Sequence, residues 1–68
     1  MKVLGSFVTP RGPATAPGRV VLCELPDSYH PFVTWWENTE HGGFSAGNYF
    51  DNLDDAKVDF SRRIKRGF

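Results

Sequence analysis

Apolar residues that favour β-strands recur in four short runs along most of the chain. The runs cover residues 1–8, 19–25, 32–37 and 44–50. They are rich in β-branched and aromatic residues, which pack well on a pleated surface. Clusters of proline, glycine, asparagine and aspartate separate them, as turns between strands require. The pattern predicts four successive β-strands, of which the second is central because its aliphatic run is continuous.

A helical period replaces the strand pattern after Asp51. Asp51 or Asn52 can cap the start of a helix, and acidic residues in its first turn and basic residues in its last complement the helix dipole. Apolar residues then recur at positions that share one side of a helix. They are Leu53, Ala56, Phe60 and Ile64. The last segment is therefore predicted to be an amphipathic helix.

The order of these elements determines the expected fold class. Four strands and one helix with short connections predict an α+β fold, β-β-β-β-α. We expect a four-stranded antiparallel sheet, or three long strands plus a short one, with the C-terminal helix packed on one face. Residues 9–18 contain three prolines and two glycines, which predicts a mobile loop between the first two strands. A length of 68 residues fits one small domain.

The adjacent residues Trp35 and Trp36 must point to opposite faces of the sheet. A single helix covers one face, so one tryptophan is expected on the open face. In the fourth strand, Phe44, Ala46 and Phe50 are more apolar than the residues between them, which assigns them to the helix side. We therefore expect the sheet core to contain Trp35.

This register predicts an open face that carries Trp36 and Tyr49, with Thr34 and Phe32 beside them. Val33 joins Trp35 on the side of the helix. A slip of one residue in the register would exchange the two tryptophans. Gly47, in the middle of a strand, indicates room for a large neighbour from the third strand.

The residues that could carry chemistry are few and dispersed. Cys23, His30 and His41 form no Cys-x-x-Cys or His-x-x-x-His pair, so no metal site is expected. Cys23 lies in an apolar strand, where burial keeps a thiol inert. Capping and solubility account for the carboxylates near the start of the helix, which are Asp51, Asp54, Asp55 and Asp59. We expect neither an enzyme nor a bound cofactor. The single cysteine excludes an intramolecular disulfide and favours a cytoplasmic location.

Charge limits the class of partner. Eight basic residues balance eight acidic ones, which argues against capture of a partner by bulk electrostatics. An exposed aromatic sheet face is typical of a protein interface. We therefore expect a non-enzymatic module that binds a protein partner. The predicted partner-binding residues are Trp36, Tyr49, Phe32 and Thr34.

Two further interactions follow from the same face. The alternative function is nucleic-acid binding, with the aromatic residues for stacking and basic residues for phosphates. The basic residues are Arg11, Arg19, Arg62, Arg63, Lys65 and Arg66. A homodimer formed by sheet faces or edges and containing Trp36 is also expected, since it would bury the aromatic face.

Short sequence segments over a little more than half of the chain carry a resemblance to known proteins. They are residues 32–35 (FVTW), 42–44 (GGF), 47–51 (GNYFD), 53–56 (LDDA) and 59–60 (DF), followed by Arg63. In these segments the chain resembles small bacterial, phage and plasmid proteins, a resemblance that implies a gene on a mobile element and no particular activity. Residues 47–60 are also similar to the last strand and helix of three-strand DNA-binding domains, such as integrase N-terminal arm-binding domains. Those domains read DNA with arginines on the open sheet face, whereas residues 32–50 here contain no lysine or arginine.

Overall fold

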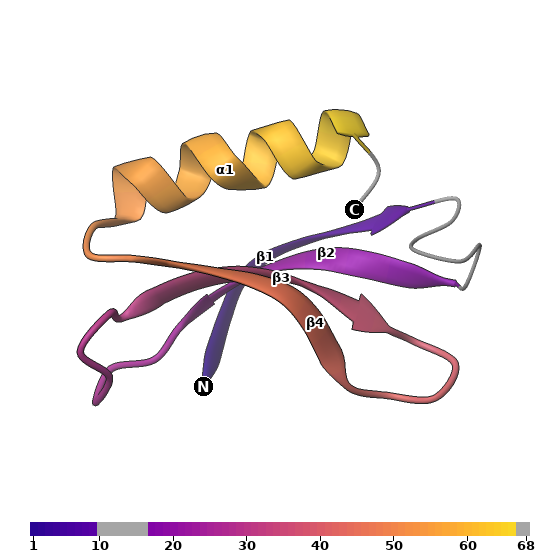
Figure 1. Cartoon of the computed structure of the whole chain (residues 1–68), viewed down its shortest axis with the longest axis horizontal. Coiled ribbons are helices and arrows are strands. Elements are labelled where there is room, and N and C mark those ends of the chain that lie inside the picture. Colours follow the sequence, from indigo (N-terminus) through magenta and orange to yellow (C-terminus); the bar gives the residue numbers. More distant parts are fainter. Residues whose placement is uncertain (10–16, 67–68) are drawn as a thin grey trace.

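The four strands lie side by side in the same order as in the sequence, and one helix packs on the sheet (Figure 1). The computed structural model describes residues 1–9 and 17–66 of the chain. The elements are β1 (Lys2–Thr9), β2 (Gly18–Glu24), β3 (Phe32–Asn38), β4 (Phe44–Phe50) and α1 (Leu53–Arg66). All neighbouring strands are antiparallel. The predicted α+β class and the β-β-β-β-α order are confirmed.

The predicted loop at residues 9–18 lies only in part within the described chain. Its two ends belong to strands, because Thr9 of β1 pairs with Gly18 of β2. Residues 10–16, which include Arg11, lie outside the described residues.

The helix α1 forms where the sequence predicts it. The side-chain Oδ1 of Asn52 accepts a hydrogen bond from the backbone N–H of Asp55 at 2.9 Å, as an N-cap does. Ala56 is fully buried, and a Cβ placed on Gly5 of β1 would lie 3.5 Å from the ring of Phe60. The predicted apolar stripe therefore faces the sheet. Within the described residues, no helix has the length and apolar character needed to cross a bilayer.

A bulge interrupts the pairing of β4 with β3. Thr34 pairs with Asn48, whereas Trp36, two residues further along β3, pairs with Ser45, three residues back along β4. The extra length includes Ala46, whose φ of 55° lies in the left-handed region that residues with a Cβ rarely adopt. The alternation of β4 side chains between the two faces of the sheet therefore shifts by one residue at this bulge.

The two tryptophans lie on opposite faces, but in the reverse of the predicted arrangement. Thr34 of β3 donates a hydrogen bond to Asp59 of α1, which places Thr34 on the helix side. Trp36, two residues on, shares that side and is only 4% exposed. Trp35 instead lies on the open face, with its ring against that of Tyr49. The prediction that Trp35 faces the helix and Trp36 the open side is wrong.

The bulge is the physical reason for this error. An uninterrupted strand would place Phe44 and Phe50 on one face, which is what the sequence interpretation assumed. Because of the bulge, Phe44 pairs with Glu37 on the open face and Phe50 pairs with Phe32 on the helix face. The apolar content of β4 therefore did not reveal which side the helix covers.

Buried apolar side chains lie on both faces of the sheet. On the open face, Val21, Cys23 and Val33 form a buried cluster, with Leu25 and Trp35 packed against it. On the other face, β2 and β3 bury side chains beneath α1. The sheet is strongly twisted (Figure 1), and β2 and β3 remain paired from Gly18 to Glu24. Burial of β2 on both faces agrees with its predicted central position.

Candidate functional site

Three aromatic residues gather on the face of the sheet that α1 does not cover. The rings of Trp35 and Phe44 are stacked, with centroids 4.4 Å apart and an interplanar angle of 19°. Tyr49 meets Trp35 edge to face, with centroids 6.3 Å apart. We call Trp35, Phe44 and Tyr49 the open-face aromatic cluster. Both arrangements are favourable for aromatic pairs.

Local features of β4 bring the cluster together. The bulge at Ala46 turns Phe44 to the open face, where it reaches Trp35. Trp35 and Tyr49 lie against Gly47, since a Cβ there would be in ordinary contact with both at 3.5 Å. The predicted large neighbour from the third strand is therefore Trp35, although the space would also admit a Cβ.

The outer part of the cluster is accessible to a partner. Phe44 is 42% exposed and Tyr49 is 52% exposed, whereas Trp35 is half-buried beneath them. An ion pair lies on the same face, with Arg19 Nε 2.5 Å from Glu37 Oε1. The face therefore combines accessible aromatic rings with a charged pair.

The predicted partner-binding residues do not all lie on this face. Tyr49 does, as predicted. Trp36 and Thr34 are buried on the helix side, and Phe32 shares that side because it lies two residues from Thr34. Their predicted exposure on the open face is wrong, because the bulge in β4 reverses the face that the sequence interpretation assigned to β3. Trp36, which was also expected in a homodimer interface, is therefore not accessible at the surface of a single copy.

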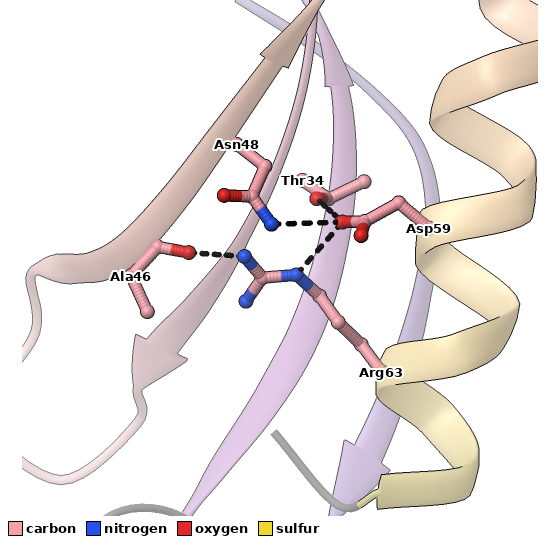
Figure 2. A network of polar contacts seen from close by, with 5 residues as sticks. All are labelled: Thr34, Ala46, Asn48, Asp59 and Arg63. Atoms are coloured by element: carbon pink, nitrogen blue, oxygen red, sulfur yellow. Dashed lines mark hydrogen bonds and ion pairs between the residues drawn. The ribbon is translucent and has the colours of Figure 1, made fainter.

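A network of polar side chains joins α1 to the sheet (Figure 2). Asp59 Oδ2 accepts hydrogen bonds from Thr34 Oγ1 at 2.5 Å and Asn48 Nδ2 at 3.2 Å. Arg63 donates to the same oxygen through Nε at 3.1 Å. Its Nη2 donates to the carbonyl of Ala46, in the bulge. One helix thus holds β3, β4 and the bulge through two of its side chains.

The electrostatics of the network favour an ionised Asp59. Burial acts to raise the pKa of this carboxyl, but three hydrogen bonds and the positive charge of Arg63 outweigh it, so the pKa lies below its ordinary value. Arg63 itself is 2% exposed, and its Nη1 has no hydrogen-bond partner among the described residues. The guanidinium therefore depends on Asp59 for its charge balance.

Sequence reasoning assigned neither residue to this network. It attributed Asp59 to capping and solubility, and it gave Arg63 to the helix dipole or, in the alternative function, to phosphate contacts. The burial of Arg63 against Asp59 was not predicted. A signal was present, because Ala56, Asp59 and Arg63 are spaced i, i+3 and i+7 on one side of the helix. A polar pair at core-facing positions indicates a buried ion pair.

The basic residues proposed for nucleic acid do not converge on the open face. Arg19 is there but pairs with Glu37, and Arg63 is buried on the other side. The remaining described members are exposed on α1, and they are Arg62, Lys65 and Arg66. Arg11 lies outside the described residues.

The other reactive groups are separated from the cluster or inert. Burial raises the pKa of the Cys23 thiol, and the neighbouring Trp35 lowers it by less. His30 Nδ1 lies 2.5 Å from Asp51 Oδ1, an exposed contact that ties the β2–β3 turn to the start of α1. His41 is exposed, 3.4 Å from Glu40. Across residues 1–9 and 17–66, no three His, Cys, Asp or Glu side chains are grouped as a metal site requires.

Comparison of the chain with protein-family models, curated proteins and solved structures gave no match. The resemblance to small bacterial, phage and plasmid proteins therefore stays a prediction.

Proposed function

We propose that the chain is a non-enzymatic interaction module that binds a protein partner through the open-face aromatic cluster. The observation that carries this proposal is the accessibility of Phe44 and Tyr49 above Trp35, on the face without a helix. Aromatic residues dominate the binding energy of protein interfaces because they bury a large area with few rotatable bonds.

The cluster is well suited to this role because its shape is set before binding. Trp35 is held between the buried cluster of β2 and β3 and the ring of Phe44. The cluster therefore loses little conformational freedom when a partner covers it, which improves affinity. The Arg19–Glu37 pair supplies polar contacts at the rim, where interfaces are normally polar.

A non-enzymatic role agrees with the placement of the polar groups. The polar side chains of the network bond one another between α1 and the sheet, so they are not available at the open face. The exposed His30–Asp51 contact belongs to a turn. The proposal includes a cytoplasmic site of action, since the single cysteine is a buried free thiol, and a gene carried on a mobile element.

A protein is favoured over nucleic acid as the partner. Phosphate recognition needs unpaired basic groups beside the stacking residues. In the described part of the chain, Arg19 is the basic residue of the open face, and it forms an ion pair with Glu37. Aromatic contacts and a balanced ion pair fit a protein surface better.

Photo-crosslinking in the native host tests the proposal. A benzophenone analogue of phenylalanine replaces Phe44 on the open face, or Val58 on the exposed side of α1 as the matched control. We expect a discrete protein adduct from position 44, absent from position 58 and lost when Tyr49→Ala is added. Adducts of equal yield from both positions, no adduct at all, or adducts removed by nuclease would contradict the proposal.

A further inference from the structure

The sheet has two edge strands, and they differ in how well they are protected. The strand order β1-β2-β3-β4 leaves β1 and β4 at the edges. In the part of the chain that the structure describes, β1 pairs with β2 alone, so the backbone groups along its outer side can bond another strand. The same groups on β4 are interrupted by the bulge, whose Ala46 carbonyl is bound by Arg63.

The edge of β1 lacks the features that normally prevent pairing. It contains no proline and no acidic residue, and its one charge, Lys2, lies at its start. Its irregularity is confined to the region between Val3 and Gly5, and the register from Gly5 to Thr9 is continuous. A bulge, a proline or a charge within that stretch would protect it.

Apolar side chains are exposed on both faces of this edge. Val8 is 75% exposed on the open face, where Val3 is also half-exposed, and Phe7 is half-exposed on the helix face. A strand added to β1 would cover side chains on both faces at once. Apolar burial would thus add to the backbone hydrogen bonds.

We propose that β1 pairs antiparallel with β1 of a second copy of this chain, which joins two four-stranded sheets into one. A two-fold axis makes the edge complementary to itself. Centred on Phe7, the middle of the regular stretch, the pairing sets Phe7 against the same residue of the second copy. Ser6 then lies opposite Val8, and both belong to the open face.

The charge pattern fits a second copy in this orientation. Antiparallel pairing places the two Lys2 side chains at opposite ends of the strand pair, whereas parallel pairing would bring them together. The formal net charge is zero, so two copies do not repel one another at long range. One strand pair is a small interface, and we expect a dissociation constant in the micromolar range.

The axis of such a dimer is perpendicular to the sheet. Both copies of α1 then lie on one side, and both open-face aromatic clusters lie on the other. The dimer does not depend on the proposed function, since it involves the edge of β1 and neither Phe44 nor Tyr49. It would present two clusters to a partner side by side, which increases avidity.

Sedimentation of matched variants from about 1 µM to about 1 mM protein tests the proposal. In Val8→Asp the new carboxylate faces Arg19 across the β1–β2 ladder, so the monomer tolerates it, but it adds a charge to the edge. Val58→Asp makes the same change on α1. We expect the wild type and Val58→Asp to dimerise and Val8→Asp to stay monomeric, with at least a tenfold weaker association. A monomeric wild type, or equal association of both variants, would overturn the proposal.

Disulfide trapping tests the register and remains decisive if Val8→Asp fails to fold. In a Cys23→Ala background, Phe7→Cys is expected to form a covalent dimer on oxidation, because opposite residues of paired strands lie within disulfide reach. Val58→Cys should remain monomeric. Trapping through Phe44→Cys in place of Phe7→Cys would show association by the open faces and would overturn the proposal. Tyr49→Ala should leave the dimer intact, which separates this result from the test of partner binding.

Discussion

The Nε atom of Arg63 lies 3.1 Å from Oδ2 of Asp59, one helical turn away, and the arginine is almost fully buried. The same guanidinium binds the Ala46 carbonyl, so the ion pair couples α1 to the bulge of β4. That bulge turns Phe44 to the open face. A contact on the helix side of the sheet thus helps to shape the aromatic cluster on the other side.

Removal of the arginine should destabilise the fold. In Arg63→Met the chain keeps an apolar side chain of similar length, but Asp59 loses its buried counter-charge. We expect a loss of about 3 kcal/mol in the free energy of unfolding, measured by urea denaturation. Arg62→Met, on the exposed side of α1, should change it by less than about 0.5 kcal/mol. Equal losses in the two variants would refute a structural role for the ion pair.

The stability of the fold should fall in acid through Asp59. Its pKa is depressed in the folded state, so its contribution is complete above the unfolded pKa, near 3.8, and is lost as the pH falls through the lower folded pKa. Unfolding free energies measured between neutral pH and about pH 2 should therefore decline below about pH 4. Asp59→Asn should flatten this decline, and Asp54→Asn, in the exposed first turn, should not. An unchanged acid limb in Asp59→Asn would contradict the assignment.

Two glycines of the sheet should respond differently to alanine. A Cβ on Gly18 would overlap the Trp36 indole and the Glu37 carbonyl, whereas a Cβ on Gly47 would make ordinary contacts at 3.5 Å. We expect Gly18→Ala to cost about 2 kcal/mol, because the backbone of β3 cannot yield easily. Gly47→Ala should be close to neutral. Thermal melts of the two variants provide the measurement, and a similar midpoint for both would contradict the packing of Trp36 over β2.

The sequence was sufficient to predict the elements and their order, since alternation, turn residues and the apolar stripe of α1 are local signals. It was insufficient for the face assignment. The deciding feature is the positive φ of Ala46, and alanine gives no local indication of a bulge. The regular alternation of side chains along β4 ends at that residue. The faces inferred from it for Trp35 and Trp36 were therefore reversed.

The candidate site was likewise predicted only in part. Tyr49 lies after the bulge and was assigned correctly, whereas Phe44 lies before it and was placed on the wrong face. The ion pair of Asp59 and Arg63 was missed for a different reason. Charged residues near helix ends usually complement the dipole, and their alignment with Ala56 was the indication that these two face the sheet.

The stack of Phe44 on Trp35 should contribute modestly to stability. Phe44→Ala removes one stacked pair and part of the cover over Trp35. We expect a loss of about 1 kcal/mol in the free energy of unfolding. Tyr29→Ala serves as the control, because Tyr29 is exposed in the β2–β3 turn, and it should change stability by less than about 0.5 kcal/mol. No difference between the two would mean that the rings of Phe44 and Trp35 do not pack in solution.

Acrylamide quenching of the two single-tryptophan variants tests most directly whether Trp35, and not Trp36, belongs to the open face. Trp36→Phe retains the half-buried Trp35, and Trp35→Phe retains the buried Trp36. Circular dichroism first establishes that both variants are folded. The emission of Trp35 should then be red-shifted and readily quenched, and that of Trp36 should be blue-shifted and protected. Protection of Trp35 together with ready quenching of Trp36 would contradict the face assignment and, with it, the aromatic cluster on which the proposed function rests.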